Sequence, residues 1–354
     1  MSGATPRPGP AAAGPLPLEA AGPCPVCGET RREDAYRGLV DRLCGTPGTW
    51  TLRCCAGCGL LILDPRYPAA HISRAYENYP FNLALPVAAP PLRGLARAVP
   101  AAYLARAYGY DDGLPRWQRA LALLAVPYPE GAEAAAFSVM YLPCVAGGEV
   151  LDVGCGGGAF LERMRGLGWR VAGVEPDPRA AEVARAQRRL DVRAGTLDDV
   201  RFEEGRFDAV TSSHVIEHVH DPLAFLRECA RVTKPGGRVV VVTPNTGSLG
   251  HRRLGTDWIG LDPPRHLYLF TRATLRRLAE KAGLAVLTVR SSVRNAEFSW
   301  LLARGKLAAW PEPGQRPPRG WAGRRARAFQ LAEWVLTLLG VPAGEELVLV
   351  GRKP

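Results

Sequence analysis

Residues 150–158 read VLDVGCGGG, an apolar strand pattern that passes through an aspartate into a glycine-rich turn. A helical pattern follows at residues 159–167. Because glycine has no Cβ, such a turn lets a nucleotide-like cofactor lie directly against the backbone. The stretch therefore predicts a cofactor-dependent enzyme.

The residues after Gly147 alternate between strand and helix patterns. Strands are expected at residues 150–153, 170–175, 191–194, 207–212, 238–242 and 284–289. Helices are expected between them at residues 159–167, 178–189, 222–231 and 272–282. This alternation predicts an α/β domain in which helices cover both faces of a parallel sheet.

The composition sets broad limits on the protein class. A chain of 354 residues can form one large domain with additions, or two domains. Its net charge of +11 suits an anionic partner such as nucleic acid, a nucleotide-linked substrate or an acidic membrane surface. Residues 1–23 are rich in Pro, Ala and Gly and are expected to form a flexible tail, without the pattern of a signal peptide. No apolar run approaches the roughly 20 residues that span a bilayer, so we expect a cytoplasmic protein.

The glycine-rich turn has a general nucleotide-binding spacing. Gly154, Gly156 and Ala159 fit the G-x-G-x-x-A pattern of dinucleotide-binding folds. Glu175 ends the second expected strand about 20 residues further on, where an acid can bind ribose hydroxyls. On these features alone, an NAD-dependent enzyme is an alternative.

Further motifs extend this pattern, with the sequences VEPD, FDAV, HVIEH and KPGGR at residues 174–177, 207–210, 214–218 and 234–238. Together with residues 151–158, and in this order, they resemble the class I S-adenosylmethionine-dependent methyltransferases over residues 147–293. A dinucleotide dehydrogenase is not expected to carry the last three motifs. The resemblance implies S-adenosylmethionine as cofactor and a Rossmann-like sheet of seven strands, six parallel and one antiparallel.

The resemblance also implies cofactor-binding residues. Gly154 and Gly156 would face the methionine part of the cofactor, and Glu175 would hold its ribose. Asp152 would support the loop, with a role in the turn alone as the alternative. The family often places adenine contacts after the third strand, here at Thr196, Leu197 and Asp198.

The end of the domain is also implied by the family. The antiparallel strand that closes the sheet is expected at residues 346–350. Residues 295–340 then form a helical insertion before this strand.

Methyl transfer needs an aligned nucleophile and, for some acceptors, a base at the carboxyl edge of the sheet. His266 is the first candidate, since its segment PPRHLYLFT at residues 263–271 resembles a substrate-side motif of sugar C-methyltransferases in which the histidine acts as base. Those relatives commonly carry glutamate at the position of Arg265, and a histidine that only orders the loop is the alternative. His214 is the second candidate, as a residue that touches cofactor or substrate.

Residues 214–218 also allow other interpretations. Their H-x-x-E-H spacing matches a zinc-protease pattern, which requires a helix rather than the strand end expected here. Some relatives bind a divalent ion through an E-x-x-E-H segment, whereas this chain has His214 at the first position. A structural role beneath the substrate pocket is the alternative.

Six of the nine cysteines lie between Cys24 and Cys58. Cys24 and Cys27 form one C-x-x-C-G knuckle, and Cys55 and Cys58 form a second, a pairing that suits tetrahedral coordination of zinc. With four thiolates such a site would be closed and structural. A ribbon that has lost its metal is the alternative.

These patterns divide the chain into four parts. After the tail at 1–23 we expect a zinc-ribbon-like domain at 24–63, a helical linker or substrate-side segment at 64–146 and the methyltransferase domain at 147–354. Tyr76 and Tyr79, in the linker, either line the substrate pocket or pack between ribbon and core.

The sequence thus predicts a methyltransferase that acts on a small or carrier-linked molecule, such as a sugar, a natural product or a lipid-linked intermediate. One alternative is an RNA methyltransferase that binds RNA phosphates with its zinc ribbon and arginines. Another is a zinc-containing binding module without catalysis. No recognised RNA-binding motif supports nucleic acid as the partner. Residues 316–339, basic and then apolar, are either a peripheral membrane contact or a lid or dimer helix.

Overall fold

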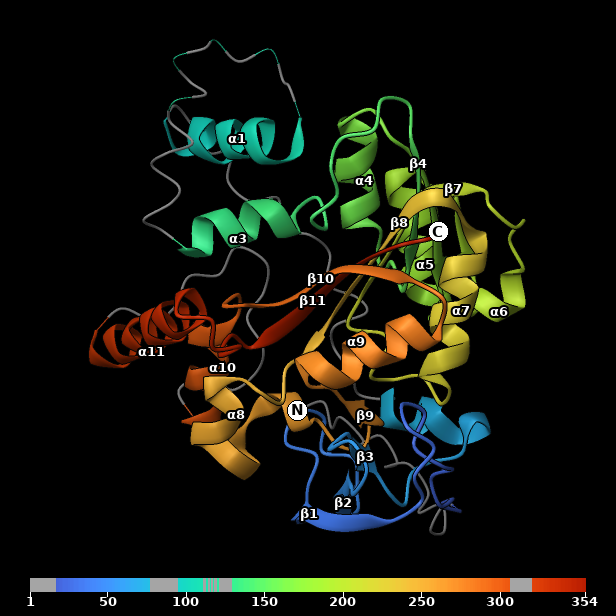
Figure 1. Cartoon of the computed structure of the whole chain (residues 1–354), viewed down its shortest axis with the longest axis vertical. Helices are drawn as coiled ribbons and strands as arrows, with labels where there is room; N and C mark the ends of the chain where they lie inside the picture. The colour runs from blue at the N-terminus through green and yellow to red at the C-terminus, as the bar shows by residue number, and fades with distance from the viewer. Residues whose placement is uncertain are drawn as a thin grey trace, which may run out of the picture.

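The computed structural model describes residues 17–76, 95–110, 113, 115, 117, 120, 129–305 and 320–354. A seven-stranded sheet and a four-stranded sheet form its framework. Tyr79, residues 1–16 and residues 306–319, on which parts of the sequence predictions fall, lie outside the described residues. Figure 1 shows the larger sheet at the centre and the smaller one, which contains β1, β2, β3 and β9, at one end.

The seven-stranded sheet has the order β10-β11-β8-β7-β4-β5-β6. Its strands are β4 Glu149–Val153, β5 Arg170–Glu175, β6 Val192–Ala194, β7 Phe207–Ser213, β8 Thr233–Pro244, β10 Ala285–Ser292 and β11 Glu346–Arg352. Only β11 runs antiparallel to its neighbours, β8 and β10. The predicted Rossmann-like sheet, with its closing strand from Glu346, is thereby confirmed.

Both faces of the sheet are buried, which explains the unbroken apolar runs in its central strands. Alternate residues point to opposite faces. Val239 and Val241 of β8 belong to one buried cluster, whereas Val240 and Val242 belong to another. The first cluster includes side chains of α7 Pro222–Val232 and α9 Arg272–Lys281, and the second includes side chains of α3 Pro129–Phe137 and α4 Ala159–Gly166.

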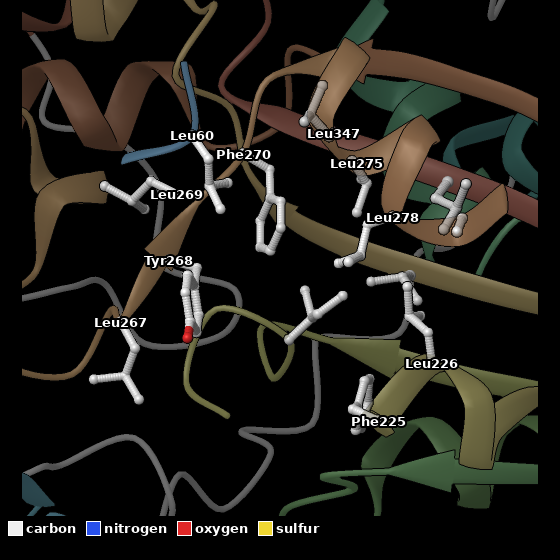
Figure 2. Close-up of a cluster of buried hydrophobic side chains, with 14 of the residues drawn as sticks. Leu60, Phe225, Leu226, Leu267, Tyr268, Leu269, Phe270, Leu275, Leu278 and Leu347 are labelled. Atoms are coloured by element: carbon white, nitrogen blue, oxygen red, sulfur yellow. The ribbon is translucent and has the colours of Figure 1, made fainter. Parts of the chain in front are cut away.

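The four-stranded sheet joins the cysteine-rich unit, residues 24–63, to the methyltransferase domain. Its order is β1-β2-β3-β9, with β1 Arg32–Leu39, β2 Trp50–Cys55, β3 Leu61–Leu63 and β9 Tyr268–Leu269. The strand β9 comes from the segment of His266, more than two hundred residues further along the chain. Figure 2 shows the shared interior, where Leu60 lies in the same buried cluster as Phe270 and the α9 residues Leu275 and Leu278.

The remaining elements surround these sheets. They are η1 Ala69–Tyr76, α1 Leu95–Tyr108, α5 Pro178–Arg188, α6 Leu197–Val200, α8 Leu249–Leu254, η4 Gly255–Asp257, η5 Ile259–Leu261, α10 Ala296–Ala303 and α11 Trp321–Leu338. Within the predicted insertion, α10 packs against α11, beside α8 (Figure 1). None of the helices in the described part of the chain has the length and hydropathy of a membrane-spanning segment.

Candidate active site

The glycine-rich turn connects β4 to α4 and requires glycine on steric grounds. Gly154 has a φ of +75°, and a Cβ added to it would lie 2.4 Å from Cγ2 of Val215. Gly156, with a φ of +52°, is likewise left-handed, a conformation that disfavours residues with a Cβ. The turn therefore presents bare backbone at the carboxyl end of β4.

Glu175 ends β5 and is hydrogen-bonded to this turn. Its Oε2 accepts from the backbone N–H of Gly156 at 2.8 Å, and its Oε1 accepts from the N–H of Asp177 at 2.9 Å. The side chain is buried, and this burial raises the pKa of its carboxyl. Each carboxylate oxygen keeps a second lone pair, which suits hydroxyl donors such as those of a ribose.

Asp152 lies in β4 directly below the turn. Its Oδ1 accepts a hydrogen bond of 2.7 Å from the hydroxyl of Thr211 in β7. Burial, aided by the nearby charge of Glu175, raises the pKa of Asp152 to about 7. This hydrogen bond ties two neighbouring strands together beneath the turn.

The predicted adenine-contact segment follows β6, beside the end of β5. The N–H of Gly195 donates to the backbone carbonyl of Glu175 at 3.0 Å. This bond places the segment next to Glu175, the residue expected to bind the ribose. Thr196 caps α6 through a reciprocal capping box with Asp199. The side chain of Leu197 is buried in the core, whereas Asp198 is exposed. Thr196 is also exposed, but its hydroxyl is engaged in the capping box with Asp199.

A cavity of about 330 Å³ opens at the same edge of the sheet. It adjoins the carboxyl ends of β7 and β8, at Ser213 and Pro244, which is where ligands bind in open α/β sheets. Both predicted catalytic histidines line it. Other lining residues come from the segment after β8, from the start of β11 and from the cysteine-rich unit: Trp258, Gly260, Asp262, Glu345, Glu346 and Leu43.

His266 is fixed in one orientation. Its Nδ1 lies 2.8 Å from the carbonyl oxygen of Gly260. Because a carbonyl can only accept, Nδ1 must carry the hydrogen, and in the neutral ring Nε2 keeps its lone pair. Nε2 lies 3.8 Å from Oδ2 of Asp262, beyond hydrogen-bond length. The ring is therefore in the tautomer that can accept a proton through Nε2.

His214 has the opposite chemistry. Its Nδ1 lies 3.1 Å from Oε1 of Glu217, and its Nε2 lies 3.0 Å from Oε1 of Glu346. Burial acts to lower its pKa, but the hydrogen bonds to these two carboxylates outweigh it and raise the pKa of His214 to about 9. At neutral pH both nitrogens therefore donate, so His214 contributes positive charge at the cavity rather than a base.

His218 belongs to the same cluster. Its ring centre lies 4.8 Å from that of His266, and its Nδ1 lies 2.9 Å from the hydroxyl of Tyr76. Burial, together with the neighbouring His266, lowers the pKa of His218 to about 4, so this ring is neutral at pH 7.

The segment 214–218 does not form the helix that a zinc protease requires, since it follows β7 as a turn. Glu217, His218 and His266 bring possible ligand atoms within 4.8 Å of one another. However, both oxygens of Glu217 already have partners, since Oε1 pairs with His214 and Oε2 accepts from the hydroxyl of Thr243 at 2.9 Å. These contacts favour the structural interpretation of the segment.

Sequence patterns missed several cavity residues. Glu345 accepts hydrogen bonds of 2.7 Å from Trp258 Nε1 and from the hydroxyl of Ser299. Glu346 is paired with Arg294, whose Nη2 lies 2.7 Å from its Oε1. Two consecutive acids directly before the apolar run at residues 347–350 are an unusual pattern. This pattern could have marked Glu345 and Glu346 as candidate site residues.

The cysteine-rich unit brings four thiols together, as its spacing predicts. The Sγ atoms of Cys24 and Cys58 lie 3.5 Å apart, as do those of Cys27 and Cys55, and all four lie within 4.8 Å of one another. Sulfurs that share a tetrahedral ion at about 2.3 Å are separated by distances of this size. The group could therefore hold a metal ion.

Comparisons with known proteins agree with this fold. A family model described as a methyltransferase domain matches residues 130–289. A ubiquinone biosynthesis O-methyltransferase of Cereibacter sphaeroides is 36% identical over 171 residues, which make up 45% of this chain and 69% of that protein.

A second relative matches over a shorter stretch. A ubiquinone biosynthesis O-methyltransferase of Xanthomonas oryzae is 43% identical over 107 residues, or 28% of this chain and 45% of the relative, so the match spans less than half of that relative's length. Among solved structures, a methyltransferase of Mesorhizobium loti aligns with a TM-score of 0.44 at 19% identity, over 63% of this chain and 98% of that chain.

Proposed function

The chain belongs to the S-adenosylmethionine-dependent methyltransferases, and we propose that it methylates a hydroxyl oxygen of a small or carrier-linked molecule. One observation carries this proposal. His266, in a cavity at the carboxyl edge of the sheet, holds its Nδ1–H against Gly260 and so keeps Nε2 free to accept a proton. The relatives' name, O-methyltransferase, supports oxygen as the accepting atom.

The residues around the glycine-rich turn fit the cofactor. Gly154 and Gly156 offer backbone without side chains, Glu175 offers carboxylate lone pairs to ribose hydroxyls, and Asp198 lies exposed on the adenine side. When bound there, S-adenosylmethionine supplies a methyl group on a sulfonium that is already activated for displacement. The protein must then bind, align and deprotonate the acceptor.

His266 is the proposed base. Its Nε2 takes the proton of the acceptor hydroxyl, and this nitrogen lies 3.8 Å from Oδ2 of Asp262. His214, held as an imidazolium between Glu217 and Glu346, would stabilise negative charge that develops on the acceptor oxygen.

The four-cysteine group is proposed to hold zinc. Cys24, Cys27, Cys55 and Cys58 supply the thiolate set of a structural site, and they leave no open coordination position for substrate. Zinc would then stabilise the ribbon without taking part in the reaction.

The outer face of α11 supports contact with an acidic membrane. This helix buries small and polar side chains, Gly323, Ala326, Gln330 and Glu333, and turns its large apolar ones outward. Leu331, Val335, Leu338 and Leu339 are 53%, 43%, 66% and 74% exposed. Arg324, Arg325 and Arg327 lie on exposed positions of the same helix, whose only acidic residue, Glu333, is buried. An apolar face with cations and no exposed anion suits anionic lipids.

Vesicle flotation tests this contact. The full chain should float with vesicles that contain phosphatidylserine, and the pair Leu331→Glu and Leu338→Glu should abolish flotation. Glu182→Gln, on the exposed side of α5, is the matched control. Equal flotation of the wild type and of the Leu331→Glu, Leu338→Glu double variant would contradict the membrane contact. If the double variant also lost a dimer that the wild type forms, this face would be assigned to a second copy of the chain.

Methyl transfer itself is tested with labelled cofactor. The protein is incubated with methyl-labelled S-adenosylmethionine and, separately, with a panel of phenols and sugars, a bacterial lipid extract and total RNA. We expect label in a methyl ether of the small-molecule or lipid fraction, and loss of that label with His266→Gln. Label in RNA would support the RNA alternative, and label on nitrogen or carbon would contradict the proposal.

A further inference from the structure

The segment that carries His266 is anchored by the cysteine-rich unit. Asp41, in the connection between β1 and β2, contacts Arg265, the residue directly before His266. Its Oδ2 accepts from Nη1 of Arg265 at 2.8 Å and its Oδ1 accepts from Nη2 at 2.7 Å. These two residues are 224 positions apart in the chain, so this contact exists only in the folded protein.

Arg265 also binds its own segment. Its Nε donates to Oδ2 of Asp262 at 2.9 Å, and its Nη1 donates to the carbonyl of Ala75 at 3.0 Å. The Arg265 side chain is 0% exposed, so its planar guanidinium lies between two carboxylates in a site without water contact. Paired hydrogen bonds from a planar guanidinium to a carboxylate fix the relative orientation of the two side chains as well as pairing their charges.

Asp41 is itself held rigidly. Its carboxylate accepts from the backbone N–H groups of Leu43, Cys44 and Thr46 at 3.0 Å each. Although burial opposes ionisation, these bonds and the guanidinium hold the pKa of Asp41 well below its usual range. Asp41 is therefore charged at neutral pH.

The other side of the segment is fixed by backbone bonds. The N–H of Leu63 in β3 donates to the carbonyl of Leu267 at 3.0 Å, and the N–H of Leu267 donates to the carbonyl of Glu217 at 2.7 Å. His266 thus lies between two buried residues, Arg265 and Leu267, each of which is bonded to another part of the molecule.

Stability alone does not require such an arrangement. Replacing a buried ion pair by apolar side chains is often neutral or stabilising, because burial removes the hydration of both charges. A buried guanidinium between two aspartates, directly before a cavity histidine, is better explained by the geometry that it imposes on that histidine.

We infer that Asp41 and Arg265 are positioning residues, through which the cysteine-rich unit holds the Gly260 carbonyl against Nδ1 of His266 and so selects the tautomer with a free Nε2. The cysteine-rich unit is then a part of the acceptor site, which it also reaches through Leu43. The use of that Nε2 as a base rests on the proposed function, but the tautomer itself does not.

Nitrogen-15 NMR of the full chain with labelled histidine tests the inference directly. The spectra are recorded at about pH 8, above the usual histidine pKa near 6.5, and His266→Asn assigns the signals of His266. We expect a protonated Nδ1 and an unprotonated Nε2 in the wild type. Free imidazole side chains prefer the Nε2–H form, so Asp41→Asn and Arg265→Lys should each shift His266 to that form in at least half of the molecules.

Asp34→Asn is the matched control, because Asp34 lies on the same unit and pairs at the surface with Arg37 and Arg53. It should leave the tautomer unchanged. Calorimetry with S-adenosylhomocysteine checks that each variant is folded. If Asp41→Asn does not fold, the tautomer is measured in Arg265→Lys alone. This variant keeps the positive charge but loses the paired hydrogen bonds of the guanidinium to Asp41.

Retention of the Nδ1–H form in folded Asp41→Asn and Arg265→Lys would overturn the inference. Because no acceptor is present, this result is independent of methyl transfer. A wild-type protein with the expected tautomer but without methyltransferase activity would contradict the proposed function and leave the inference standing.

Discussion

Glu333 of α11 and Glu345, directly before β11, form a buried carboxyl pair. Among the described residues, neither Oε2 of Glu333 nor Oε1 of Glu345 has another hydrogen-bond partner. The two side chains meet at Gly250, whose N–H donates to Oε1 of Glu333 and whose Cα lies against Oε1 of Glu345. Burial raises the pKa of both carboxyls, and the charge of Glu345 raises that of Glu333 further. We infer that the two carboxyls share one proton, which would give both groups a hydrogen-bond partner.

This pair predicts a pH-dependent stability. A carboxyl with a raised pKa in the folded state binds a proton that the unfolded chain releases above pH ~4.3. The stability from the shared proton is therefore complete below that pH and declines as the pH rises through the folded-state pKa, by about 1.4 kcal/mol per pH unit for one proton. The melting temperature should therefore fall as the pH rises above about 5, because the folded state then holds a proton that the unfolded chain has released.

Glu333→Gln should remove this decline, because an amide donates to Glu345 without titrating. Glu182→Gln, at an exposed position of α5, should leave the pH dependence of the melting temperature as in the wild type. Parallel curves for the wild type and Glu333→Gln would contradict the shared proton.

Gly154→Ala should impair cofactor binding. The new Cβ meets Cγ2 of Val215 at 2.4 Å, and a φ of +75° costs an L-residue about 1–2 kcal/mol. We expect affinity for S-adenosylhomocysteine, measured by calorimetry, to fall about tenfold or more, since 1.4 kcal/mol corresponds to a factor of ten. Gly166→Ala, at the end of α4 with open space around its Cα, is the control and should bind as the wild type does.

His214→Gln should destabilise the protein in a pH-dependent way. The folded state raises the pKa of His214 to about 9, so its charge contributes stability that is complete below the unfolded value near 6.5 and is lost as the pH passes 9. The variant leaves Glu217 and Glu346 without their shared cation. Its melting temperature should lie well below that of the wild type at pH 6 and approach it at pH 10; an equal difference at both pH values would exclude the charged state of His214.

Cys24→Ser and Cys55→Ser should each lose the metal and loosen the cysteine-rich unit. Elemental analysis should find one zinc per chain in the wild type and in Cys44→Ser, whose thiol lies in the same unit but outside the four-cysteine group. Hydrogen exchange in β2 and β3 should rise in the two ligand variants. Wild-type protein that is purified without zinc and shows unchanged exchange after chelation would rule out a structural metal.

The parts of this fold that follow from the sequence are those with local signals. The turn after Val153 is marked by its glycines, the parallel strands by their apolar runs, and the metal group by its paired cysteines. A last strand from Glu346 was expected from its sequence pattern, whereas its antiparallel place in the sheet was expected only because the family closes its sheet in this way.

The contacts that shape the cavity lie far apart in the chain and leave no local signal. Asp41 reads as an ordinary loop acid, and Arg265 as a departure from the family pattern, until folding places one against the other. The strand β9 has two residues, too few for a period to be seen, and its pairing with β3 depends on the packing of the whole cysteine-rich unit. The outward apolar face of α11 is likewise visible only once its opposite face is known to be buried.

Calorimetric titration with S-adenosylhomocysteine tests the central claim most directly, because it asks whether the turn and Glu175 bind the product of the methyl donor. The account predicts one site per chain in the wild type and in His266→Gln, and at least about tenfold weaker binding in Glu175→Gln, since hydrogen bonds to a charged group contribute about 1.5–3 kcal/mol. Folded wild-type protein that binds no S-adenosylhomocysteine, or Glu175→Gln that binds as tightly as the wild type, would contradict it.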